Sequence, residues 1–162
     1  GGYGLMRFSI LLPSLFMLIA MAGIIATAIL CMRQTDLKAL IAMSSVSHMN
    51  LVIAATLIQS QWSFTGAMTM MIAHGLTSSA LFCLANTTYE RINSRAMVLL
   101  RGTMLIFPLA GAWWLTILLS NMALPPLINF SAELLIMASI FDWSAMAFLI
   151  VALNLVFTTA YT

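Results

Sequence analysis

One carboxylic acid stands out among the residues that could do chemistry, because it lies inside a strongly apolar stretch. Glu133 is the single charged residue between Arg101 and Asp142, and it follows the pair Pro125-Pro126. An acidic group at the centre of a bilayer costs roughly 2.5 to 3.5 kcal/mol on insertion scales, so such a residue faces a protein interior or a wet path and usually has a function. Glu133 is therefore the leading candidate for a titratable site.

Lysine and histidine side chains lie in another apolar run, and helical geometry places them on one face. At about 100° per residue, Lys38, Ser45 and His48 fall within about one quadrant of a helix, and Thr56 continues that face. These side chains can therefore line one polar path. The alternative interpretation of Lys38 is an interfacial lysine whose ammonium group reaches the aqueous boundary.

A second histidine lies in a further apolar run, beside hydroxyl groups. His74 is followed one helical turn later by Thr77 and Ser78. An imidazole in such surroundings can accept and pass protons near neutral pH. A buried histidine that is simply hydrogen-bonded is commoner than a proton relay, so this motif by itself is weak.

The composition indicates an integral membrane protein. The chain is 63% hydrophobic and 6% charged with a mean hydropathy of +1.09, values that exclude a water-soluble globule. Its net charge of +2 comes from few ionisable side chains, which gives nucleic acid or an acidic protein no basic surface to bind. Cys31 and Cys83 lack CxxC spacing, so neither a disulfide framework nor a metal cluster is expected. We find no phosphate loop, no nucleophile elbow and no ligand set for zinc, haem or an iron-sulfur cluster.

Apolar windows of about 20 residues, the length that crosses a bilayer as a helix, predict an all-α polytopic transmembrane bundle with about five spanning units. Membrane strands are excluded because these runs are too long and unbroken for the alternating pattern of such strands. Pro13 falls in the first turn of the first unit, where a missing N–H is tolerated. The expected units run from about Ser9 to Met32, from Leu37 to Ile58, from Trp62 to Tyr89, from Met104 to Asp142, and from Ser144 onward.

The fourth unit is expected to be a broken helix. Pro125 and Pro126 lack backbone donors, so they release the carbonyls of Asn121 and Met122 from their helical partners. Interrupted helices of this kind form the ion sites of transporters, and Glu133 follows the break by about two turns. The alternative is a proline kink used for packing, beside a carboxylic acid that burial keeps neutral.

Basic residues predict how the chain is oriented in the membrane. Most of them fall on one side, which should therefore be the cytoplasmic or matrix side, while Arg7 is alone on the other. The residues on the basic side are Arg33, Lys38, Arg91, Arg95 and Arg101.

Four segments are specific enough to indicate a family: "GGYGLMR", "RQTDLKALIAMSSVSHMNLV", "FTGAMTMMIAHGLTSSALFCLANTTYERINSR" and "NMALPPLINFSAELLIM". Together they closely resemble the antiporter-like membrane-arm subunits of mitochondrial NADH:ubiquinone oxidoreductase, respiratory complex I. The resemblance covers nearly the whole chain, with the strings in the same order and at the same helix spacing. It implies a bundle built from two inverted repeats, of which residues 1–162 are a fragment and form a single membrane domain in the second half.

The resemblance also implies a function. It is that of a proton-translocating subunit of an enzyme of the translocase class in the mitochondrial inner membrane, coupling NADH oxidation by ubiquinone to proton transfer. Such a subunit holds no redox centre and contacts lipid and the other membrane-arm subunits of complex I. NADH, flavin, iron-sulfur clusters and ubiquinone would all be bound by other subunits.

Roles of single residues follow from the same resemblance. Glu133 matches the acidic residue beside the broken helix, which implies a terminal proton donor and acceptor. His74 matches a histidine of the same polar axis, and Lys38 and His48 match polar positions of their motifs. The chain departs from the family where Ala132 replaces a usual Gly, a change that bears on how sharply the chain turns ahead of the acid.

Two other functions fit the same titratable groups. One is a subunit of a multisubunit cation/proton antiporter, which would move sodium without redox coupling. The other is a structural spacer whose polar residues only hold helices together. The spacer predicts that replacing Lys38 or His74 by alanine changes stability rather than turnover.

Overall fold

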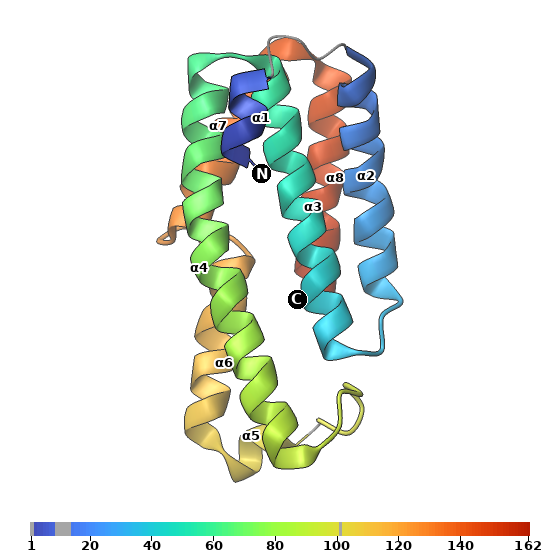
Figure 1. The fold of residues 1–162 in the computed structure, drawn as a ribbon, viewed down its shortest axis with the longest axis vertical. Coiled ribbons are helices and arrows are strands. Elements are labelled where there is room, and N and C mark those ends of the chain that lie inside the picture. Colours follow the sequence, from blue (N-terminus) through green and yellow to red (C-terminus); the bar gives the residue numbers. More distant parts are fainter. Residues whose placement is uncertain (1, 9–13, 101) are drawn as a thin grey trace.

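The computed structural model describes residues 2–8, 14–100 and 102–162, and within these ranges every regular element is a helix. Figure 1 shows how the helices are arranged. They are α1 (Gly2–Phe8), α2 (Ser14–Met32), α3 (Leu37–Ile58), α4 (Gln61–Ile92), α5 (Thr103–Ile106), α6 (Pro108–Asn121), α7 (Ile128–Trp143) and α8 (Ala145–Tyr161).

These helices confirm the all-α polytopic bundle. Helix α3 has the predicted bounds, and α4 extends the third unit at both ends. In the part of the chain that the structure describes, three helices are each long and apolar enough to cross a membrane, namely α2 from Leu15, α3 and α4. Helix α8 is a shorter apolar helix of 17 residues. The fourth unit is divided among α5, α6 and α7. The predicted first residue of the bundle, Ser9, and the nearby Pro13 lie outside the described residues.

Helix α3 lies among several other helices of the bundle. It packs against α2, α4 and α7, while α8 packs against α2 and α7. In Figure 1, α6 and α7 follow one another along the length of α4, and both contact it. Because α4 has 32 residues, it is about 48 Å long and can support both halves of the broken unit.

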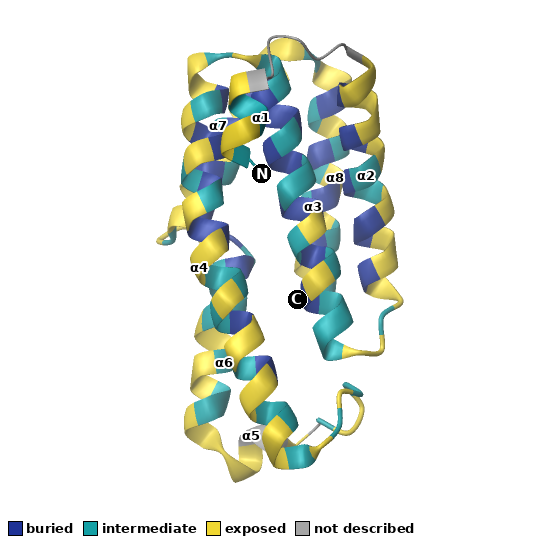
Figure 2. Cartoon of the chain, in the orientation of Figure 1, coloured by how far each residue is buried: buried dark blue, intermediate teal, exposed yellow. Residues whose placement is uncertain are grey.

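Small residues lie at the contacts between helices. Ala54 of α3, Ala67 of α4 and Ala132 of α7 are fully buried, and they belong to the main apolar core together with Ile24 and Ile136. Between helices surrounded by lipid, close backbone approach and van der Waals contact replace the hydrophobic effect as the main attraction. Figure 2 shows the buried segments turned toward neighbouring helices and the exposed ones on the outside of the bundle.

The predicted break at Pro125-Pro126 is confirmed, because α6 ends at Asn121 and α7 begins at Ile128. Ala123 in this connection has a φ of 52°, in the left-handed region that costs a residue with a Cβ roughly 1–2 kcal/mol. Ala132 lies inside α7 and not in a turn. The expected effect of its methyl group on a turn ahead of the acid therefore does not arise.

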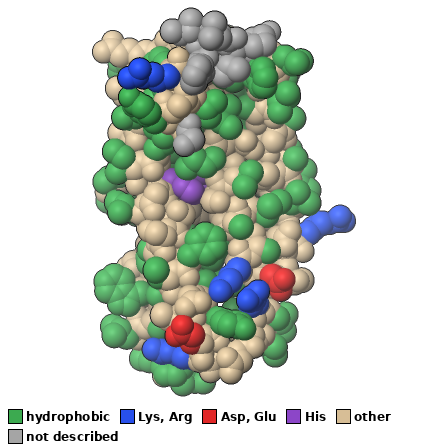
Figure 3. Space-filling view, viewed as in Figure 1, with side chains coloured by type: hydrophobic (Ala, Val, Ile, Leu, Met, Phe, Trp, Pro, Cys, Tyr) green, Lys and Arg blue, Asp and Glu red, His purple; other side chains and the backbone are tan. Residues whose placement is uncertain are grey.

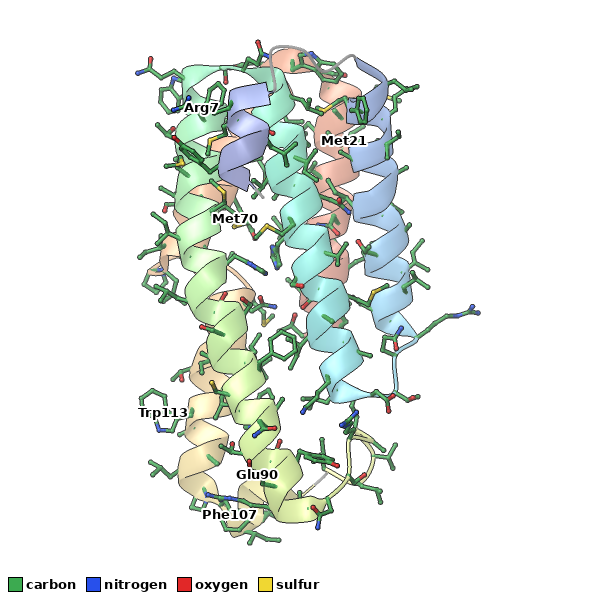
Figure 4. All side chains as sticks on the ribbon, viewed as in Figure 1. Arg7, Met21, Met70, Glu90, Phe107 and Trp113 are labelled. Atoms are coloured by element: carbon green, nitrogen blue, oxygen red, sulfur yellow. The ribbon has the colours of Figure 1, made fainter. Side chains whose placement is uncertain are left out.

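The two ends of the bundle differ in charge, as predicted. Arg33 follows α2, Lys38 lies in the first turn of α3 and Arg91 lies in the last turn of α4, so all three are at the same end. Figure 4 places Arg7 at the opposite end, and Figure 3 shows most of the visible Lys and Arg side chains toward the lower end. Arg101 lies outside the described residues, and the side of the membrane that each end faces stays a prediction.

The connection after α4 is held against the start of α3 by backbone hydrogen bonds. The N–H of Leu37 donates to the carbonyl of Arg95 at 3.1 Å, and the N–H of Met97 donates to the carbonyl of Thr35 at 3.0 Å. Asp36 occupies the N-cap position of α3 without a capping bond from its side chain. These backbone bonds keep Arg95 at the basic end of the bundle.

We predict that Gly66→Ala separates α4 from α7. A Cβ at Gly66 would lie 2.9 Å from Cγ1 of Ile136 and 3.2 Å from its backbone nitrogen, which is too close for a carbon atom. Overpacking of this kind costs roughly 1–3 kcal/mol, so the thermal unfolding temperature of the protein should fall.

The matched control is Gly75→Ala on the same helix, where a Cβ would have no neighbouring atom within 4 Å. This variant should be as stable as the wild type or slightly more stable, because alanine favours a helix over glycine by roughly 1 kcal/mol. Equal unfolding temperatures for the two variants would contradict the close packing at Gly66.

Candidate functional site

The break between α6 and α7 sets the position of Glu133. Asn129 lies in the first turn of α7, and its buried side-chain amide donates a hydrogen bond of 2.7 Å to the backbone carbonyl of Ser120 near the end of α6. This bond adds a second donor to a carbonyl near a helix end, which also accepts from the N–H of Ala123 at 3.3 Å. It also fixes where α7 starts, and Glu133 follows about one turn later.

Glu133 faces a histidine across the bundle. Its Oε1 lies 3.8 Å from Nδ1 of His48 on α3, and the two side chains are only 13% and 6% exposed. The separation is longer than a direct hydrogen bond and short enough for one water molecule or a small side-chain rotation to join the two groups. The structure therefore places a carboxyl group and an imidazole together inside an apolar bundle.

The second histidine extends this arrangement onto a third helix. The rings of His48 and His74 have their centroids 5.5 Å apart and are tilted by 45°. His74 is buried on α4, so α3, α4 and α7 each contribute one titratable side chain. We call Glu133, His48 and His74 the titratable cluster. A proton can pass through such a cluster in short steps between neighbouring groups.

Lys38 lies apart from the titratable cluster. It shares α3 with His48 but is about 15 Å away along the helix axis. Its Nζ lies 3.5 Å from Oδ1 of Asn86 and 5.1 Å from the centre of the Tyr89 ring, both on α4. The Asn86 amide in turn donates to Glu90 at 2.8 Å. Lys38 therefore belongs to a polar group at the basic end of the bundle.

The hydroxyl groups near the predicted path bond to their own helices. Ser45 donates to the carbonyl of Ala42 at 2.7 Å, and Thr56 donates to that of Ile53 at 2.8 Å. On α4, the Thr77 hydroxyl donates to the backbone carbonyl of His74 at 3.2 Å and so does not donate to the imidazole. Such bonds to the preceding turn are common for Ser and Thr in helices. The predicted polar face of α3 and the surroundings of His74 on α4 thus have fewer free hydroxyl donors than the sequence indicates.

Helix α8 contributes polar residues that sequence reasoning missed. Asn154 and Thr158 are both buried, and they line a small cavity together with His48 and Glu133. The remaining lining is apolar and consists of Leu51, Met137, Val151 and Leu155. One asparagine within the apolar run "FLIVALNLVF" was the available signal, since a carboxamide in a membrane helix needs a polar partner.

The described residues hold no group of three or more His, Cys, Asp or Glu side chains that could bind a metal ion. Cys31 is buried on α2 and Cys83 is exposed on α4, and both are free thiols. The chemistry that these residues support is proton transfer among carboxyl, imidazole and ammonium groups.

Fold and site together define a polytopic helical membrane protein with an interrupted helix and a buried cluster of carboxyl and imidazole groups. A family model described as "NADH:quinone oxidoreductase/Mrp antiporter, TM" matches residues 1–159. The chain belongs to this family.

Curated relatives match over the whole chain. The NADH-ubiquinone oxidoreductase chain 4 of Scyliorhinus canicula is 53% identical, that of Carassius auratus 52% and that of Struthio camelus 53%. In each case the match covers 100% of this chain and 37% of the relative. The chain therefore spans a little over a third of the length of these relatives.

We predict that Asn129→Leu loosens the connection between α6 and α7. The substitution keeps the approximate size of the side chain but removes one of two donors to the carbonyl of Ser120, which also accepts from the N–H of Ala123 at 3.3 Å, and one hydrogen bond contributes roughly 0.5–1.5 kcal/mol. The thermal unfolding temperature should fall. Ser131→Ala, at an exposed position two residues further on, removes a hydroxyl that bonds only within α7 and should have little effect. If both variants unfold together with the wild type, the bond does not stabilise the break.

Proposed function

We propose that this chain is part of a proton-translocating membrane subunit of NADH:ubiquinone oxidoreductase. The oxidation of NADH by quinone, which takes place elsewhere in the complex, would drive proton transfer across the inner mitochondrial membrane. The observation that supports this most strongly is the contact between Glu133 and His48 on two different helices, 3.8 Å apart and largely shielded from solvent. The names of the relatives agree with it.

Buried charges make such a cluster responsive to its surroundings. Within the bundle the effective dielectric constant is lower than in water, so a charge that appears on one group acts strongly on its neighbours. A proton that reaches His74 would repel one on His48, and a negative Glu133 would attract it. Each transfer would therefore depend on the charge of the adjacent group, which allows a distant reaction to drive proton movement electrostatically.

Lys38 is assigned a different position in this proposal. Its ammonium group lies at the basic end, beside Asn86 and the ring of Tyr89. From there it would exchange protons with the aqueous boundary and influence the titratable cluster through the length of α3. Glu133, His74, Lys38 and His48 are thus proposed as proton-transfer residues with unequal roles.

The proposal includes the setting of the chain. Residues 1–162 would form a single membrane domain in contact with lipid and with the other membrane-arm subunits of complex I. NADH, flavin, iron-sulfur clusters and ubiquinone would be bound by other subunits, and this chain would carry no cofactor of its own. The groups that it supplies are side chains that hold and pass protons.

The matched family includes antiporter subunits as well as oxidoreductase subunits. Relatives named as oxidoreductase chain 4 favour redox coupling over sodium and proton exchange. Purification of the native assembly distinguishes the two, since flavin and iron-sulfur subunits should accompany this chain only in the oxidoreductase.

We predict that Glu133→Gln abolishes proton pumping while the complex still assembles. Glutamine has nearly the same shape but cannot gain or lose a proton, and a positioned acid or base contributes roughly 10²–10⁴-fold to a proton-transfer step. Pumping would be measured in vesicles that contain the intact complex. Asp142→Asn, at an exposed acid near the end of α7, is the control and should keep normal pumping. Full pumping in the Glu133 variant would overturn the proposal.

Substitutions on α3 should separate the roles of its two titratable residues. His48→Leu interrupts the cluster between Glu133 and His74, so pumping should fall at least about tenfold. Lys38→Gln keeps a side chain that can still bond to Asn86, and the loss should be smaller. A structural spacer would instead show reduced stability with normal turnover in both variants, a result that unfolding and activity measurements on the same samples would reveal.

A further inference from the structure

The small cavity beside Glu133 contains more polar surface than the titratable cluster alone supplies. Asn154 reaches it from α8, a helix that carries none of the predicted proton-transfer residues. The carboxamide is buried, and its Oδ1 has no hydrogen-bond partner among the described protein atoms. Buried polar atoms of proteins nearly always have a partner, so this free carboxamide oxygen requires an explanation.

The dimensions of the cavity fit one small polar molecule. About 10 Å³ is available to the centre of a water molecule, which meets the lower bound of the roughly 10–15 Å³ that one water needs. A buried water typically makes about three hydrogen bonds. The cavity offers three polar partners from three helices, namely the carboxyl group of Glu133, the imidazole of His48 and the carboxamide of Asn154.

We propose that Asn154 is a positioning residue that holds one buried water molecule between Glu133 and His48. This inference rests on the proposed function and adds a residue to it. The water joins two groups that are 3.8 Å apart and therefore too distant for a good direct hydrogen bond. When a proton moves, the carboxyl O–H of Glu133 donates it to the water oxygen as that water gives one of its own protons to the imidazole. The carboxyl group becomes a carboxylate, the imidazole becomes an imidazolium, and the water is regenerated.

The anchor is needed because the rest of the cavity is apolar. Thr158, the other polar residue of α8 at this site, already donates its hydroxyl to the carbonyl of Leu155 at 2.7 Å. Asn154 thus has a free acceptor that can orient the water. Because Asn154 lies on a third helix, the water stays in place when the side chain of Glu133 or His48 moves.

The test uses infrared difference spectroscopy on the intact complex. The carboxyl stretching band of Glu133 is first assigned by its loss in Glu133→Gln. In Asn154→Leu, which has similar volume and no polar atoms, this band should move to higher wavenumber because the carboxyl group loses a hydrogen bond. A water band that is sensitive to H₂¹⁸O should disappear, and pumping should fall roughly threefold to tenfold, the effect of one net hydrogen bond on a proton-transfer equilibrium.

Two further variants make the result decisive. Asn50→Leu introduces the same change on α3, where the amide lies against Gly23 and does not line the cavity, and it should leave both bands unchanged. Asn154→Ser keeps a polar group, so it should retain the water band and most of the pumping, and it serves as the test if the leucine variant does not assemble.

Carboxyl and water bands in assembled Asn154→Leu that are identical to those of the wild type would overturn the inference, as would loss of the water band in Asn154→Ser. If Glu133→Gln stops pumping while these bands are unchanged, only the role of Asn154 fails. If Glu133→Gln pumps normally, the proposed function itself fails.

Discussion

A carboxyl group can remain inside this apolar bundle only where other helices bring polar atoms to it, and this requirement explains several features of the fold. Helix α7 must start close enough to α3 for Glu133 to reach His48 at 3.8 Å. The proline break and the bond from Asn129 to Ser120 determine that start. Close packing of α4 against α7 at Gly66 also positions α4, whose His74 contacts the ring of His48.

Helix α3 connects the two polar regions of the molecule. At one end, Lys38 lies beside polar and aromatic side chains of α4, while near the middle His48 faces α7 and the ring of His74. Between these regions, the hydroxyl groups of Ser44, Ser45 and Ser47 bond to backbone carbonyls of the same helix. A rigid helix of this kind can hold two charged or chargeable groups at a fixed distance, so the electrostatic influence of one on the other depends little on side-chain motion.

The sequence predicted the helices well, for physical reasons that can be named. Runs of about 20 apolar residues and adjacent prolines leave few alternatives for the backbone in a membrane, and α3 and the break lie where they were expected. Periodicity gives the angle of a side chain around its helix but does not identify the neighbouring helix, which is why Lys38 and His48 were assigned to one path although they meet different partners. Asn154 was missed because a single amide becomes informative only when the cavity beside it is known.

Infrared difference spectra of the intact assembly, recorded during turnover, test the central claim most directly. We predict that the carboxyl band of Glu133 disappears and returns as the group releases and regains its proton, and that the band is absent throughout when glutamine replaces the acid. A carboxyl band that stays in one state during rapid NADH oxidation would contradict the account, because Glu133 would then be a structural residue and protons would cross the membrane by another route.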